Sequence, residues 1–130
     1  MIDKTLEIIE WCDPKFWVIE NPVGRLSKLR PQLGEPWYFQ PHEFAGWLDA
    51  PFREKEQYKK KTGLWGKFTK PSKKVLPILP GYNPIMALGG KSERTKELRS
   101  MTPIGFSKAF YDSNKWCTTE NSRKIRFRLK

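Results

Sequence analysis

The amino-acid sequence predicts an α/β fold with a mostly parallel sheet and flanking helices. Residues 16–19 form a continuous apolar run (Phe-Trp-Val-Ile), which is typical of a strand that is buried on both faces, as in a parallel sheet. Ile2, Leu6 and Ile9 recur at helical spacing just before it, and an Asp-Pro turn separates the two patterns. A helix, a tight turn and a buried strand together make half of a βαβ unit, whose strands are parallel.

Composition limits the class of protein. The chain has 130 residues, which suits one domain or part of one. Lys and Arg total 25 against 14 Asp and Glu, a net charge of +11, and such an excess is typical of proteins that bind polyanions, nucleic acid first. Alternatively, the excess of basic residues only gives the protein a soluble basic surface with no polyanionic partner. A hydrophobic content of 38% argues against wholesale disorder.

The chain has only two cysteines, Cys12 and Cys117, and one histidine, His42, so a zinc site of the usual ligand count is excluded. Cys12 ends the amphipathic pattern, and we expect it to be buried as a small hydrophobic residue. The N-terminus does not resemble a signal peptide, and no apolar run is long enough to span a membrane. We therefore expect a cytosolic protein with reduced thiols.

The first helix is expected from Asp3 to Trp11, and the strand that should precede it is missing. The strand at residues 16–22 should stop at Pro22, which lacks an amide donor and favours extended geometry at Asn21. Glu20 then lies at the carboxyl end of a central strand, where open α/β sheets place ligand chemistry. An acid in that position is also commonly a solvated loop residue.

The middle of the chain alternates short elements with loops. Residues 25–30 predict a short basic helix that a proline ends, and residues 36–41 predict an edge strand flanked by prolines. Residues 43–50 are ambiguous, although their aromatic residues have helical spacing. Residues 52–61 predict a charged loop, and residues 62–68 predict a third strand.

The last third is richer in proline and glycine. Residues 70–84 predict a loop with an extended apolar patch, and residues 87–96 predict a mobile loop. Thr102 and Pro103 are suited to the start of a helix, which should extend to about Asn114. Residues 123–130 alternate basic and apolar residues, which fits either an edge strand or a phosphate-contacting tail.

Three separated segments, read together, resemble the phage-type members of the cytosine-5 DNA methyltransferase family. Residues 14–22 carry Glu-Asn-Pro and look like the Glu-Asn motif of that family. Residues 57–66 are similar to its Gln-x-Arg-x-Arg segment, with lysines in place of the arginines. Residues 98–103 resemble its Arg-x-Leu-Thr-Pro element, which leads into a helix. The order and the separations agree, and the resemblance spans residues 2–115.

The resemblance implies a partial Rossmann-like methyltransferase fold in a single, incomplete domain. Residues 1–66 would be the C-terminal half of the catalytic sheet. Residues 67–97 would be a Pro/Gly-rich loop or a small target-recognition insert. Residues 98–130 would supply a C-terminal helix and a basic tail.

The implied reaction is methyl transfer from S-adenosylmethionine to C5 of a flipped cytosine in double-stranded DNA. Cytosine C6 is a poor electrophile, and an acid at ring N3 makes it more reactive; the resemblance gives this role to Glu20. Asn21 and Pro22 would fix its position. Lys59 and Lys61 stand where the family has arginines, and would assist at the base or its phosphates without arginine's planar fork.

The flipped base must leave the duplex, so further residues must hold the DNA backbone. The resemblance and the basic run after the third strand give this set of substrate-binding residues: Gln57, Lys67, Lys70, Lys73, Lys74 and Arg99. A run of lysines is commonly only a solvated surface. Trp65, Phe106 and Phe110 are expected in the core and not as base-stacking platforms.

The sequence lacks two features of the family, the Gly-rich S-adenosylmethionine turn and the Pro-Cys loop that carries the nucleophile. We therefore expect no nucleophile and no metal in this chain, and a methyltransferase that works only with a separate or upstream N-terminal half, in the cytoplasm of a bacterium or phage-infected cell. The alternatives are a non-catalytic basic DNA-binding module and an inactive remnant.

Overall fold

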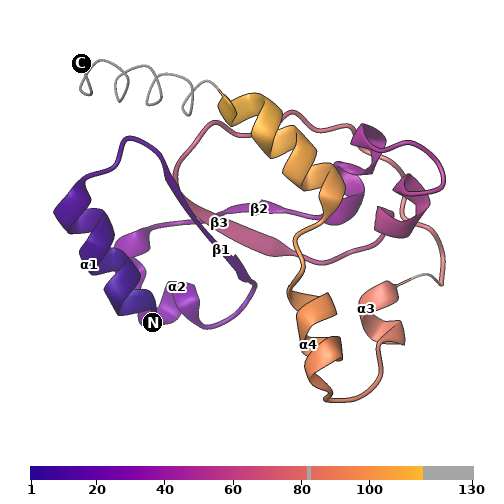
Figure 1. The fold of residues 1–130 in the computed structure, drawn as a ribbon, viewed down its shortest axis with the longest axis horizontal. Helices are drawn as coiled ribbons and strands as arrows, with labels where there is room; N and C mark the ends of the chain where they lie inside the picture. Colours follow the sequence, from indigo (N-terminus) through magenta and orange to yellow (C-terminus); the bar gives the residue numbers. More distant parts are fainter. Residues whose placement is uncertain (82, 116–130) are drawn as a thin grey trace, which may run out of the picture. The chain divides into compact units, whose positions relative to one another are not determined.

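A computed structural model of the chain describes residues 1–81 and 83–115. The labelled helices and strands are, in chain order, α1 (Ile2–Cys12), β1 (Trp17–Pro22), α2 (Leu26–Leu29), β2 (Trp37–Phe39), β3 (Thr62–Lys67), α3 (Pro84–Ala87) and α4 (Glu93–Ser100) (Figure 1). A further helix covers residues 104–115. Short 3-10 helices lie at Pro31–Leu33, Pro41–Glu43, Ala45–Trp47 and Arg53–Glu56.

The described residues form two compact units that are interleaved in the sequence. Unit 1 comprises Met1–Tyr38 together with Thr62–Phe68, and unit 2 comprises Phe39–Lys61 together with residues 69–115. The interleaving arises because β3 returns to pair with β1, so that residues 39–61 are an excursion from unit 1. The expected segments of a single domain, with boundaries after residues 66 and 97, stay a prediction.

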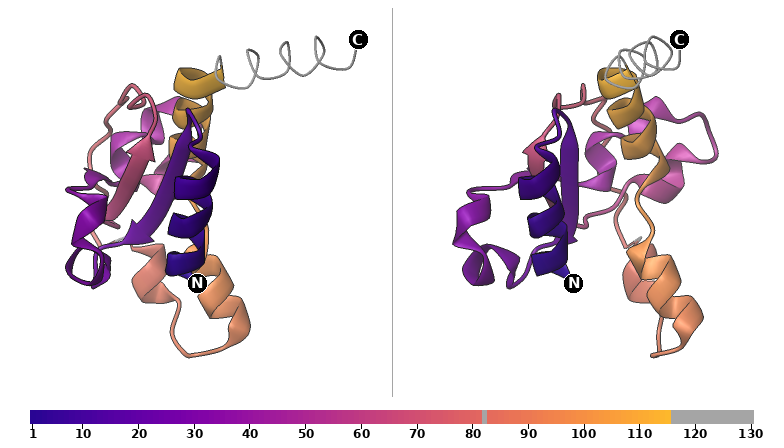
Figure 2. Two further views of the ribbon diagram at one scale, coloured as in Figure 1. Left: turned by 90° about the vertical axis from the view of Figure 1, so that its left-hand side faces the viewer. Right: turned by 60° about the vertical axis from the view of Figure 1, so that its left-hand side comes forward.

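The mixture of helices and strands is confirmed, but the prediction of a mostly parallel sheet is wrong. In the part of the chain that the structure describes, the sheet has three strands in the order β1-β3-β2, and β1 runs antiparallel to β3, side by side in Figure 2. Gly66 allows this pairing, because its φ is 142° and a side chain there would collide with the carbonyl oxygen of Trp17. An apolar run does not specify the direction of the neighbouring strand.

The burial of β1 also differs from expectation. Its residues alternate between half-buried and exposed, so the strand is covered on one face only. The strand does end at Pro22, as predicted. Likewise β2 is an edge strand of the sheet, as its flanking prolines predicted.

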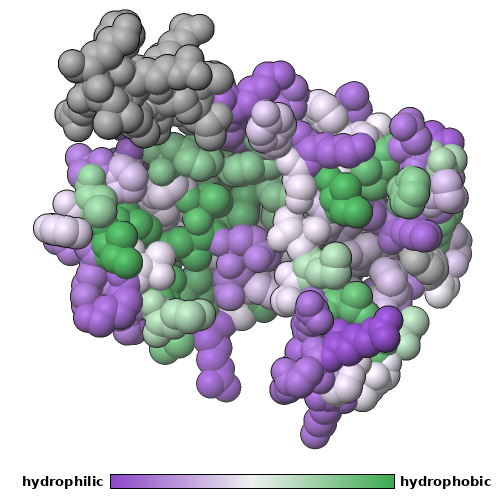
Figure 3. Space-filling model, in the orientation of Figure 1, coloured by the Kyte–Doolittle hydropathy of each residue, from purple (hydrophilic) through white to green (hydrophobic). Residues whose placement is uncertain are grey.

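The predicted first helix is confirmed as α1. Ile2, Leu6 and Ile9 are half-buried along one stripe, and the helix ends at Asp13, whose left-handed backbone (φ 41°) lets its N–H donate to the Ile9 oxygen at 2.9 Å. The other side of α1 is open, and Trp11 is 87% exposed. Figure 3 shows apolar side chains exposed over α1 and β1.

Cys12 is exposed, so its predicted burial is wrong. It lies at the last position of α1, beyond the half-buried stripe of the helix. Sequence spacing placed it near that stripe, but did not show that α1 has no buried residue at all.

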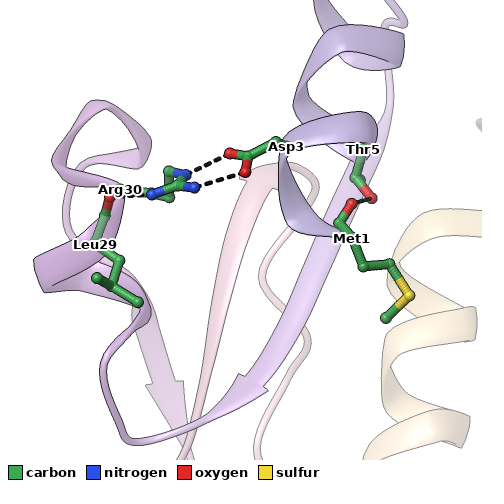
Figure 4. A network of polar contacts seen from close by, with 5 residues as sticks. All are labelled: Met1, Asp3, Thr5, Leu29 and Arg30. Carbon is green, nitrogen blue, oxygen red and sulfur yellow. Dashed lines mark hydrogen bonds and ion pairs between the residues drawn. The ribbon is translucent and has the colours of Figure 1, made fainter.

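A bidentate ion pair joins α1 to the end of α2 within unit 1 (Figure 4). Arg30 donates from Nε to Asp3 Oδ1 at 2.6 Å and from Nη2 to Asp3 Oδ2 at 2.7 Å, and its Nη1 donates to the Leu29 oxygen. These hydrogen bonds hold the pKa of Asp3 below its ordinary value of 3.8. The same contacts raise the pKa of Arg30.

One segment with an ambiguous pattern and one segment expected to be a mobile loop are partly helical. The ambiguous residues 43–50 form a 3-10 turn at Ala45–Trp47. Helix α4 occupies part of the predicted mobile loop, and Ser92 caps it by accepting the N–H of Thr95 on its Oγ at 3.2 Å. Serine before a charged run is a helix-start signal that outweighs the preceding glycine pair.

Three phenylalanines form the centre of unit 2. The rings of Phe39 and Phe106 stack with centroids 3.8 Å apart, and Phe44 meets both rings edge-on. Phe106 belongs to the helix at residues 104–115, whose start the Thr-Pro pair predicted. The predicted core positions Trp65 and Phe106 are confirmed as buried, and Phe110 is half-buried.

A buried carboxylate caps the same helix. Glu56 is 8% exposed and accepts the N–H groups of Ile104 at 2.6 Å and of Gly105 at 2.8 Å. A β-carbon on Gly105 would meet the carbonyl oxygen of Phe44 and come within 2.9 Å of the Glu56 carboxylate. Glycine is therefore required for the carboxylate to reach the first turn of the helix.

Glu56→Gln should lower the free energy of unfolding by about 2 kcal/mol, because an amide cannot accept both N–H groups and places its own donor against one of them. Urea denaturation followed by tryptophan fluorescence measures the change. Glu35→Gln, on an exposed loop, is the matched control and should leave the midpoint unchanged. Equal midpoints for wild type and Glu56→Gln would contradict the capping role.

The Asp3 carboxyl should titrate below 3.8 in the folded chain and move up toward 3.8 in Arg30→Gln, as read by carbon-detected NMR. Because the folded pKa is the lower one, the pair stabilises the fold above the unfolded value and loses that contribution as pH falls through the folded value. Arg25 is exposed, and Arg25→Gln is the control, which should leave the titration midpoint of Asp3 unchanged. A wild-type midpoint at or above 3.8 is the contrary outcome.

Candidate functional site

The first candidate segment lies at the end of β1. Glu20 is exposed and pairs across the sheet with Leu64, so the two side chains share one face. Asn21 is half-buried and pairs with Gly63, and its Nδ2 donates to the carbonyl oxygen of Pro22 at 2.9 Å. The Glu-Asn-Pro segment therefore lies directly beside residues 62–64, which belong to the second candidate segment.

The second segment places its polar side chains in different surroundings. Gln57 is 7% exposed, its side-chain Nε2 donates to the Pro77 oxygen at 2.8 Å, and its backbone carbonyl oxygen accepts the N–H of Leu79. It therefore holds the proline-rich loop and does not reach the surface as a DNA contact. Lys59 and Lys61 are both exposed, and Lys61 immediately precedes β3.

The predicted backbone-binding lysines are all exposed: Lys67, Lys70, Lys73 and Lys74. In unit 1, Lys67 pairs with Asp13 at 3.4 Å. In unit 2, Lys73 pairs with Glu43 at 2.8 Å, and the Lys74 ammonium lies 4.0 Å from the centroid of the Trp47 ring. The Lys67–Asp13 pair is exposed on both sides, and such pairs stabilise a fold by only about 0–1 kcal/mol.

The third segment contains the last turn of α4. Arg99 is exposed, and its Nη2 donates to the Leu88 oxygen at 2.6 Å. Lys60 of the second segment reaches this turn: its Nζ donates to the Arg99 oxygen at 2.7 Å and to the Met101 oxygen at 3.4 Å. The second and third segments are thus joined inside unit 2.

Sequence reasoning did not single out Lys60 or Glu56. Both belong to charged stretches that predict a solvated loop, and their partners lie far along the chain. One signal was available in the sequence. Tyr58 and Thr62, two residues suited to burial, flank the lysines, which indicates that this segment is not a fully solvated loop. Cys117 and residues 123–130 lie outside the described residues.

The described residues do not fit S-adenosylmethionine. After β1 the chain passes through one glycine, Gly24, into the four-residue helix α2, and this connection is not a glycine-rich turn at the start of a long helix. Within residues 1–81 and 83–115, no three His, Cys, Asp or Glu side chains gather as metal ligands.

None of the helices in the described part of the chain is both long and apolar enough to cross a membrane. Comparison with protein-family models, with curated proteins and with solved structures finds no match. The family resemblance therefore depends on the three sequence segments alone.

Proposed function

We propose that the chain is the C-terminal portion of a cytosine-5 DNA methyltransferase, with Glu20 as the acid at N3 of a flipped cytosine. The supporting observation is the pairing of β1 with β3. Two segments that are far apart in the sequence, and that resemble two motifs of one family, become neighbouring strands with Glu20 exposed beside them.

Glu20 has a defined proton-transfer role. When a thiolate bonds to cytosine C6, the electrons of the C5–C6 double bond move into the ring, and negative charge develops toward N3 and O2. A proton from the Glu20 carboxyl to N3 neutralises that charge and leaves a carboxylate. The hydrogen bond from Asn21 to the Pro22 oxygen fixes the backbone just after Glu20.

Lys59 and Lys61 supply positive charge toward the base or its phosphates. Both side chains are exposed, and each is a point charge that suits a phosphate oxygen better than the edge of a base. Lys67, Lys70, Lys73, Lys74 and the exposed Arg99 add to the basic surface. The partner is double-stranded DNA, and the net charge of +11 favours it.

The thiolate and the methyl donor come from another polypeptide or from an N-terminal half. S-adenosylmethionine supplies the methyl group when it is bound there. In this proposal the chain contributes the acid and DNA contacts, in the cytoplasm of a bacterium or phage-infected cell, and is inactive alone.

The chain should bind duplex DNA with an affinity that falls as salt rises, because phosphate contacts release counterions. Lys59→Gln should reduce the slope of log K against log [salt] by about 1, as loss of one phosphate contact does. Fluorescence anisotropy at several salt concentrations measures both quantities. Lys28→Gln removes the same charge from exposed helix α2 and is the matched control, with an unchanged slope expected. Equal slopes for Lys59→Gln and Lys28→Gln would remove Lys59 from the interface.

A mixture of the chain with the N-terminal half of a phage-type cytosine-5 methyltransferase should transfer labelled methyl groups to DNA. Glu20→Gln should lower kcat about 10²–10⁴-fold, because an amide cannot donate the proton. Glu35→Gln is the control and should retain activity. If the chain binds DNA but no such half gives methyl transfer, the chain is a non-catalytic DNA-binding module and the proposed function is wrong. Full transfer by Glu20→Gln would remove Glu20 from the chemistry.

A further inference from the structure

Glu56 and Lys60 form hydrogen bonds with backbone groups in the connection between α4 and the helix at residues 104–115. We call this pair of side chains the clamp. Glu56 accepts the N–H groups of Ile104 and Gly105, at 2.6 and 2.8 Å. Lys60 donates to the backbone oxygens of Arg99 and Met101, at 2.7 and 3.4 Å. All of these residues belong to unit 2.

The charges of this clamp match the helix ends that they contact. The carboxylate of Glu56 lies at a helix N-terminus, where backbone N–H groups lack partners and the helix dipole favours a negative charge. The ammonium of Lys60 lies at the C-terminal end of α4, where carbonyl oxygens lack partners and a positive charge is favoured. Hydrogen bonds with an ionised partner are about twice as strong as neutral ones.

Lys60 and its two neighbours lie on opposite sides of the segment. Along the chain Tyr58 is buried, Lys59 exposed, Lys60 half-buried, Lys61 exposed and Thr62 buried. Such alternation is that of an extended chain, in which successive side chains leave on opposite sides. Lys59 and Lys61 therefore lie on the side opposite to Lys60, which donates to backbone oxygens at the end of α4.

We infer that Lys60 is a positioning residue, which holds Lys59 and Lys61 toward the DNA backbone without contacting DNA itself. This role rests on the proposed DNA-binding function. It goes beyond that function because it assigns the middle lysine of the run to contacts within the protein and not to DNA. It also gives the third sequence segment a task, since the end of α4 is the surface to which Lys60 is bound.

Acetylation of the wild-type chain tests the clamp without a variant. With a limiting acetylating reagent, Lys60 should react several-fold more slowly than Lys59 and Lys61, as resolved by fragment ions in tandem mass spectrometry. Duplex DNA should slow Lys59 and Lys61 and leave the rate at Lys60 unchanged. Equal rates in the free chain, or protection of Lys60 by DNA as strong as that of its neighbours, would overturn the assignment.

Variants separate positioning from direct contact. Lys60→Met should weaken DNA binding about tenfold, the equivalent of one lost charge-assisted hydrogen bond, with the salt slope unchanged, whereas Lys59→Gln lowers the slope by about 1. Lys60→Arg keeps donors for both oxygens and should restore the affinity. A slope lowered by about 1 in Lys60→Met, or an affinity equal to wild type, would overturn the positioning role.

The same measurements distinguish this inference from the proposed function. Wild-type binding with a changed slope in Lys60→Met would overturn only the positioning role. Absence of salt-dependent DNA binding by the wild-type chain would overturn the proposed function, and the positioning role with it.

Discussion

The pairing of β1 with β3 is the constraint on which unit 1 depends. It requires Gly66, because a side chain at that position would collide with the carbonyl oxygen of Trp17 on the neighbouring strand. Once the strands are paired, residues 39–61 must leave unit 1 and return to it, which gives two units interleaved in sequence. The pairing also fixes Glu20 opposite Leu64, so the candidate acid and the second sequence segment share one register.

Unit 2 depends on side chains that satisfy backbone groups far along the chain. Glu56 caps a helix that begins at residue 104, and Gln57 holds the proline-rich loop through the oxygen of Pro77. Proline-rich segments have few N–H groups of their own to form regular structure, so partners must come from elsewhere. Three stacked and edge-on phenylalanine rings supply the apolar centre around which these bonds form.

The chemistry that the chain can offer is therefore narrow and specific. It presents one acid at a strand end, an exposed pair of lysines and a strongly basic composition. In the described residues the exposed thiol, Cys12, is on α1 and lies outside residues 14–22, 57–66 and 98–103. In the proposed function this acid and these lysines contribute to base methylation only if the nucleophile and the methyl donor come from another part of the enzyme.

The sequence by itself determined the features that depend on neighbouring residues. Helical spacing determined α1, and Pro22 determined the end of β1. The flanking prolines determined that β2 is an edge strand, and the Thr-Pro pair determined the start of the helix at residues 104–115. Each of these is a local preference of backbone geometry, so a single segment contains enough information. Tertiary structure decided the rest: the antiparallel direction of the sheet, the exposure of Cys12, and the burial of Gln57 and Glu56. These features depend on which distant strand or backbone group a residue meets, and periodicity along one segment does not contain that information.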